Sequence, residues 1–138
     1  MSQDNKDLAR SFFEEADRGR TPVELLTSDF TAHFPGLPPM DQEAYDQFEV
    51  MIRSAFSGIA HPIDDVVAED DRVAVRLQLE GTHTGEFMGV PASGQAISAE
   101  GTAFLRITDG AIAQFWGFVD QLGLMQQIGG LPAPQQTG

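Results

Sequence analysis

The sequence contains no cysteine, which removes disulfides, thiolate nucleophiles and thiolate metal ligands from consideration. The groups left for acid–base chemistry are the carboxylates, three histidines and one tyrosine. The dinucleotide pattern GxGxxG, the phosphate loop GxxxxGKS and the zinc pattern HExxH are missing as well. We therefore predict a protein that uses neither a cofactor nor a metal.

Basic residues are scarce: the chain has 8 Lys and Arg against 21 Asp and Glu, a formal net charge of -13. The negative electrostatic potential of such a chain repels nucleic acid and anionic lipid, so we predict neither nucleic acid nor membrane as a partner. Two interpretations of the charge stay open. The chain is an ordinary acidic soluble protein, or it comes from a halophile, where dense counterions screen the repulsion between carboxylates.

Long apolar runs are also missing, since no stretch approaches the ~20 residues that a membrane-spanning helix needs. No basic and apolar segment of the signal-peptide type opens the chain, so we expect a cytoplasmic protein. With 138 residues, 41% of them hydrophobic, the chain suits one domain with a core and a small cavity. We place this domain at residues 1–130 and expect a flexible tail at 131–138, which is rich in Gly, Pro and Gln.

The hydrophobic period is that of a helix in the first part of the chain and that of a strand after residue 62. Apolar residues recur at helical spacing in 8–16 and 44–55, and Asp41 is a suitable N-cap for the second helix. The predicted shorter elements are a helix from Thr21-Pro22 to about Ser28 and strands at 30–34, 66–67, 73–79, 104–108 and 111–120. This order predicts an α+β fold with helices across one face of a mostly antiparallel sheet.

The last two strands meet at Asp109-Gly110, a pair that favours the positive φ angles of a tight hairpin. Strict alternation then places Asp120 on one face with Ile112, Gln114, Trp116 and Phe118, and places Phe115, Gly117 and Val119 on the other. We predict Asp120 as a catalytic carboxylate, with Trp116, Gln114 and Phe118 as substrate contacts. An N-cap role for Asp120 in a helix over 121–128 is equally open.

The histidines supply further candidates. His83 lies in a Thr-His-Thr-Gly turn, where it is either a second proton-transfer group or a hydrogen-bond partner of the loop backbone. His33 faces away from Phe34 and is a candidate substrate contact at the pocket rim. His61 and Tyr45 are expected at the surface, because Tyr45 falls off the apolar stripe of its helix.

Three motifs in the second half of the chain together resemble the SnoaL-like polyketide cyclases. They are HTGxFxGxPxxG at 83–94, RIxDG at 106–110 and WxxxDxxGLxxQxG at 116–129, and the resemblance covers residues 7 to 129. It implies an NTF2-like cone, in which a strongly curved sheet and helices enclose an apolar pocket, with no cofactor and with assembly into a homodimer or larger homo-oligomer. In the cyclases a carboxylate catalyses an intramolecular aldol condensation, and Asp120 matches this acid.

Three functions remain open at this point. The first is acid–base chemistry, as a cyclase, lyase or isomerase, on a hydrophobic carbonyl compound. The second is a small-ligand-binding or dimerisation module without catalysis, and the third is an epoxide-hydrolase-like enzyme, which requires Arg76 or Arg106 to turn inward. A ketosteroid-isomerase-like reaction is disfavoured because it calls for a buried tyrosine or a protonated Asp. We expect a second copy of the chain to cover the sheet face that carries Phe115 and Val119.

Overall fold

The computed structural model describes residues 2–132, so residues 133–138 of the predicted tail lie outside the described residues. The elements in chain order are α1 (Ser2–Asp17), the 3-10 helix η1 (Val23–Leu25), β1 (Leu26–His33), α2 (Gln42–Ala55), β2 (Phe56–Ala60), β3 (Ile63–Glu69), β4 (Arg72–His83), β5 (Ala96–Thr108), β6 (Ala111–Val119) and α3 (Gln121–Gln127). The predicted α+β class is confirmed.

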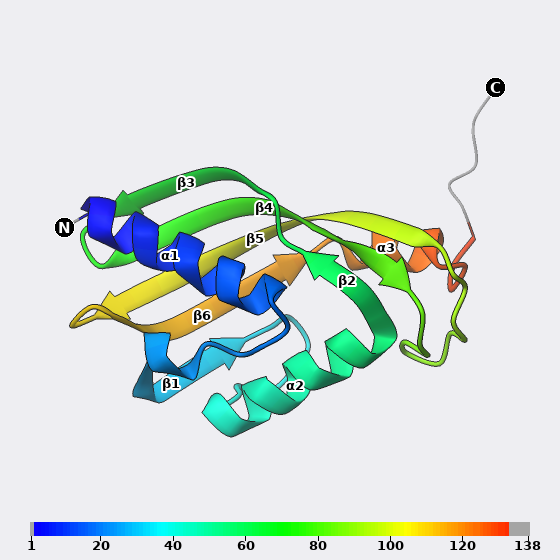
Figure 1. Ribbon diagram of the computed structural model, residues 1–138, viewed down its shortest axis with the longest axis horizontal. Helices are drawn as coiled ribbons and strands as arrows, with labels where there is room; N and C mark the ends of the chain where they lie inside the picture. Colours follow the sequence, from blue (N-terminus) through cyan, green and yellow to red (C-terminus); the bar gives the residue numbers. More distant parts are fainter. Residues whose placement is uncertain (1, 133–138) are drawn as a thin grey trace.

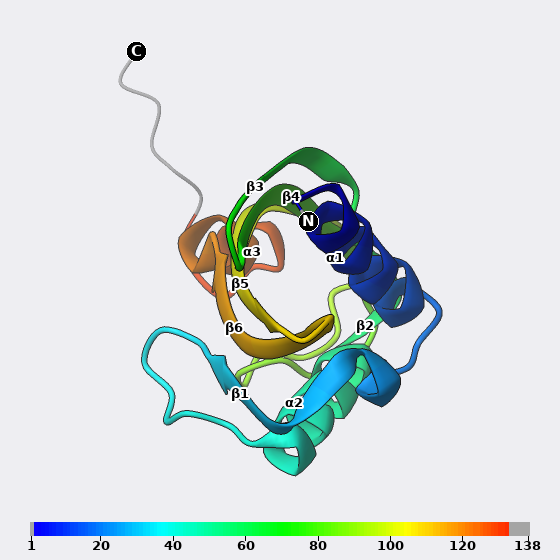
Figure 2. The same cartoon turned by 90° about the vertical axis from the view of Figure 1, so that its left-hand side faces the viewer.

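Six strands form one strongly curled mixed sheet. Its order is β1-β6-β5-β4-β2, and β3 pairs with β4 as well. The β1–β6 pair is parallel and every other pair is antiparallel. Figure 2 shows how the sheet curls around its concave side, which α1 and α2 cover, whereas α3 lies at one end of the sheet (Figure 1).

Two helices cover the concave side because each has one apolar stripe. On α1 the buried residues are Ala9, Phe12 and Phe13, at the spacing of one helix face. The predicted N-cap of α2 is confirmed, since Asp41 Oδ1 accepts a hydrogen bond of 2.8 Å from the backbone N of Ala44. The stripe on α2 is rotated from the prediction: Tyr45 is buried, and Met51 is 48% exposed.

The hairpin turn between the last two strands forms where the sequence places it. Asp109 and Gly110 both have positive φ, 51° and 78°, as a two-residue turn between β5 and β6 requires. Asp70 has φ 54° in the turn between β3 and β4. Both turns are local, and local residue preferences suffice to predict them.

The segment after Thr21 is the clearest error in the predicted elements. In place of a helix reaching Ser28, only Val23–Leu25 is helical, and β1 starts at Leu26. Leu26 is 8% exposed and pairs with Ile112 of β6. Pairing with a distant strand therefore overrides the local helix signal.

A β-bulge in β6 changes which residues share a face. Ile107 pairs with Ile112 and Arg106 pairs with Gln114, so Ala113 is an extra residue. Beyond the bulge the alternation is shifted by one, which puts Ile112 and Phe115 together in the core at 0% and 5% exposure. The prediction that Phe115 faces outward was wrong.

The core has two parts. The larger one lies under α1 and α2 and contains a cluster of aromatic side chains, Phe12, Phe13, Phe30, Phe34, Tyr45, Phe48 and Phe115. The smaller one lies at the α3 end and combines Phe56 and Phe87 with Ile97, Leu124 and Ile128.

Candidate functional site

Asp120 lies at the junction of β6 and α3. Its Oδ1 accepts a hydrogen bond of 2.9 Å from the backbone N of Gly123, so the predicted N-cap is confirmed. Its own backbone N donates to the carbonyl oxygen of Glu100 at 2.9 Å, which fixes the residue to β5. The side chain is exposed. Within residues 2–132, the hydrogen bonds of the carboxylate use Oδ1 alone, which leaves Oδ2 open.

His83 is completely buried near the same end of the sheet. Its Nδ1 accepts from the backbone N of Ser93 at 3.1 Å and lies 2.8 Å from the Ser93 hydroxyl. The predicted hydrogen bond to the loop is therefore present. Because Nδ1 accepts, the ring proton is on Nε2, and this buried donor has no partner in the described part of the chain. An unpaired buried donor costs about 1–3 kcal/mol.

The predicted substrate contacts of β1 and β6 lie on the outer, convex face of the sheet. His33 and Trp116 are register partners, and their rings stack at 5.1 Å with an interplanar angle of 13°. Phe104 meets the indole edge-on at 6.1 Å, and Phe118 is 50% exposed. Gln114 follows the same alternation, opposite to Phe115. The structure brings these side chains together, but away from the aromatic core.

The prediction that Tyr45 lies at the surface was wrong, because its side chain is only 3% exposed. Its ring lies 5.4 Å from Phe30 and 5.9 Å from Phe115. Burial raises the pKa of the Tyr45 hydroxyl well above its ordinary value, and the neighbouring charge of Glu49 raises it further. The hydroxyl is therefore a neutral donor at neutral pH.

Glu49 is a residue that the sequence analysis missed. Burial raises the pKa of its carboxyl, while the charge of His61 and a hydrogen bond with Tyr45 act in the opposite direction. The signal that could have found it is the spacing of Tyr45 and Glu49 by one helical turn, which places both on one side of α2.

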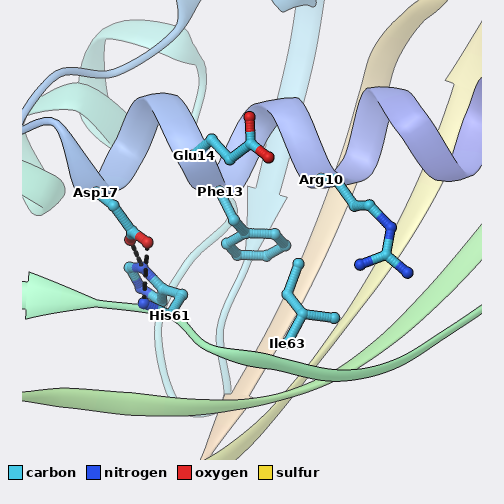
Figure 3. Close-up of a pocket in the computed structure, with 6 residues that line it drawn as sticks. All are labelled: Arg10, Phe13, Glu14, Asp17, His61 and Ile63. Atoms are coloured by element: carbon cyan, nitrogen blue, oxygen red, sulfur yellow. Dashed lines mark hydrogen bonds and ion pairs between the residues drawn. The ribbon is translucent and has the colours of Figure 1, made fainter.

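His61 and Asp17 form a hydrogen-bonded pair at the junction of α1 with the β2–β3 corner (Figure 3). The two are joined by His61 Nδ1 to Asp17 Oδ1 at 2.6 Å and by the His61 backbone N to Asp17 Oδ2 at 3.2 Å. The imidazole is 17% exposed, less than its predicted surface position suggests. The pair borders a hollow of about 250 Å³, lined by Arg10, Phe13, Glu14, Asp17, His61 and Ile63.

The arginines needed by an epoxide-hydrolase-like site lie on the outside. Arg76 is 59% exposed and pairs with Asp65 at 2.9 Å. Arg106 is 50% exposed and pairs with Asp71 at 3.2 Å. The inward arginine that this function requires is therefore not present at either position.

No three His, Asp or Glu side chains converge within residues 2–132 in a way that could hold a metal ion. None of the described helices is long and apolar enough to cross a membrane.

The sheet is strongly curled, two helices cross its concave side, and Asp120 lies at the end of its last strand. This architecture is the NTF2-like α+β cone that the resemblance implies. The sequence-family model of the SnoaL-like polyketide cyclases matches residues 7–128, and the chain belongs to this family. The family resemblance of the three motifs is thereby confirmed.

Characterised relatives agree with this assignment. The chain is 31% identical over 132 residues to aklanonic acid methyl ester cyclase DnrD of Streptomyces peucetius, covering 89% of each chain. It is 31% identical over 98 residues to the nogalonic acid methyl ester cyclase of Streptomyces nogalater, covering 70% of this chain and 72% of that one. Among solved structures, wild-type IdmH from Streptomyces antibioticus superimposes with a TM-score of 0.82 at 28% identity, over 91% of this chain and 98% of that chain.

Proposed function

We propose that this protein catalyses a cofactor-independent intramolecular aldol cyclisation of a hydrophobic polyketide-type carbonyl compound, with Asp120 as the general acid and base. One observation carries the proposal. Oδ1 of Asp120 accepts the helix-capping hydrogen bond from the backbone N of Gly123, and Oδ2 accepts no hydrogen bond from the described residues. A carboxylate held in this way is oriented and still able to exchange a proton. The identity with the methyl ester cyclases supports the substrate class.

The proposed reaction needs only proton transfers. Asp120 removes a proton from a carbon next to a carbonyl, and the electron pair passes to the carbonyl oxygen as an enolate. The enolate carbon attacks a second carbonyl of the same molecule, which forms the ring C–C bond. The resulting alkoxide takes the proton back from Asp120, so the product is an isomer of the substrate.

His83 has a supporting role in this proposal. Its Nε2–H is buried and unpaired in the described part of the chain. A substrate oxygen that becomes negative during the reaction would pair with this donor and gain more from it than in water. The substrate would then satisfy a hydrogen bond that the free protein lacks.

The test is the variant Asp120→Asn, assayed with aklanonic acid methyl ester. Asparagine caps helices as well as aspartate, so α3 should stay folded while the acid–base group is lost. We expect the cyclisation rate to fall by about 10²–10⁴-fold, the usual contribution of general acid–base catalysis, with an almost unchanged melting temperature.

The matched control is Asp41→Asn, which changes the equivalent cap of α2. We expect this variant to cyclise the ester at the wild-type rate. An Asp120→Asn protein that keeps the wild-type rate would overturn the role of Asp120.

A ligand-binding module without catalysis is the second candidate, and the exposed position of Asp120 favours it. In that case the wild-type protein would bind the ester in calorimetry, would leave it unconverted, and would bind it equally well after Asp120→Asn.

A further inference from the structure

The hollow at the α1 and β2–β3 corner combines a fixed imidazole with apolar walls and a cation (Figure 3). One carboxylate holds His61 at two points, the ring Nδ1 and the backbone N. A deprotonated carboxylate only accepts hydrogen bonds, so the neutral imidazole carries its proton on Nδ1. Nε2 is then the basic nitrogen, and Asp17 stabilises the imidazolium that forms when it takes a proton.

The walls of the hollow suit a planar apolar molecule. The Phe13 ring lies 5.4 Å from the imidazole ring of His61, and Ile63 lies on the opposite strand. Arg10 also lines the hollow, and the ion pairs within residues 2–132 do not include it. Its guanidinium is therefore available to a ligand oxygen.

Charge and volume narrow the class of ligand. Glu14 and Asp17 line the hollow, and Glu49 lies near His61, so carboxylates outnumber the cations and disfavour an anionic ligand. The hollow of about 250 Å³ is smaller than the roughly 300–1,000 Å³ of a pocket for drug-sized ligands. A neutral compound of one or two fused rings matches this volume better than a multi-ring polyketide.

We propose that this hollow is a second acid–base site, separate from Asp120, at which His61 exchanges the α-proton of a small neutral benzylic ketone. Nε2 takes a proton from the carbon next to the carbonyl. The C–H electron pair forms the C=C bond of an enolate, and the carbonyl π pair moves to the oxygen beside Arg10. The imidazolium then returns a proton to the carbon, so nothing is consumed. Asp17 acts as the positioning residue for His61.

The experiment is deuterium exchange at the benzylic carbons of 2-indanone in D2O, followed by NMR. The wild-type protein should accelerate exchange over buffer, and His61→Asn should lower the protein-dependent rate by at least about 100-fold. Asp17→Asn should lower kcat and leave KM unchanged, and a far-UV circular dichroism spectrum equal to that of the wild type would exclude a smaller folded fraction as the cause. In 15N-labelled protein, 2-indanone should shift the amide signals of residues 10–17 and of His61 and Ile63.

Arg10→Gln keeps the proposal testable if His61→Asn does not fold, because Arg10 is exposed. This variant should slow exchange about 10-fold with its melting temperature unchanged. Asp41→Asn, on the opposite helix from Asp17, should exchange at the wild-type rate. Exchange that survives in both His61→Asn and Arg10→Gln, or a wild-type rate equal to that of buffer, overturns the proposal.

Discussion

Tyr45 shows how the surroundings of one residue decide its chemistry. It is the only tyrosine of the chain, and its ring packs among phenylalanines of the core. The hydroxyl is next to Glu49 on the following turn of α2. Ketosteroid-isomerase-like chemistry was disfavoured because Tyr45 was expected at the surface, and the buried tyrosine that this chemistry calls for is present.

The raised pKa of Tyr45 predicts a delayed titration. In the folded protein, absorbance at 295 nm should show no tyrosinate at pH 10, where an ordinary tyrosine is half ionised. The unfolded chain loses this proton at lower pH than the folded one, so the free energy of unfolding should fall as pH rises past 10. Since there is one tyrosine, the signal has one source; a half-ionised folded protein at pH 10 would contradict the prediction.

Single residues that act locally were predictable, and residues whose position depends on the tertiary structure were not. The cap at Asp41 and the turn at Asp109-Gly110 need only neighbouring residues, and both are confirmed. The burial of Tyr45 depends on the rotation of α2 against the sheet, which no periodicity count determines. The Asp17–His61 pair joins residues 44 positions apart, and the sequence carries no signal for it.

At the level of elements, β6 determines what faces the core. The extra residue Ala113 turns Phe115 inward and leaves Trp116 and Phe118 on the convex face. The sequence does not reveal this bulge, because apolar residues stand at both odd and even positions of β6. Strict alternation and the bulged arrangement are therefore both compatible with the pattern. The strand itself was predicted correctly, and its register was not.

The aromatic cluster leaves no room for a side chain at Gly117 of β6. A Cβ at this position would lie 2.5 Å from Cε1 of Phe34 and 2.8 Å from Cε1 of Phe115. Phe34 cannot easily move away, because its ring also packs against Phe48 at 4.7 Å. We therefore expect Gly117→Ala to lower the free energy of unfolding by about 1–3 kcal/mol, measured by urea denaturation.

The control for this prediction is Gly81→Ala in β4, where the nearest atom to a new Cβ is the carbonyl oxygen of Ser57 at 3.2 Å. We expect a smaller loss of stability there. Equal stability of Gly117→Ala and the wild type would mean that the aromatic cluster is looser than its ring distances imply.

At the level of the whole molecule, the convex face of the sheet carries an outer aromatic patch formed by Phe104, Trp116, Phe118 and His33. Phe104 is 41% exposed and Phe118 is 50% exposed. The expected outer face with Phe115 and Val119 was wrong, because Phe115 lies in the core and Val119 packs against its smaller part. We propose that a second copy of the chain covers this patch, because exposed aromatic patches of this kind usually mark an interface.

Light scattering tests the proposed homodimer. The wild-type protein should have the mass of two chains at micromolar concentration, and Phe118→Asp should have the mass of one. The control Val50→Asp changes a side chain of α2 that is 53% exposed and lies away from the sheet, so it should stay dimeric. With -13 on each chain, the dimer should tighten as KCl is added, since salt screens the repulsion between copies. A wild-type monomer would rule out this use of the patch.

The parallel pairing of β1 with β6 has a consequence for how the protein is made. Leu26 finds its partner Ile112 only after the 85 residues between them have left the ribosome. Until then β1 has no strand beside it, and the concave side that buries Phe12 and Phe30 is incomplete. Contacts between such distant segments slow folding and keep apolar surface exposed while synthesis continues. A nascent chain stalled before β6 should therefore be a good substrate for chaperones, whereas a chain released after α3 should fold by itself.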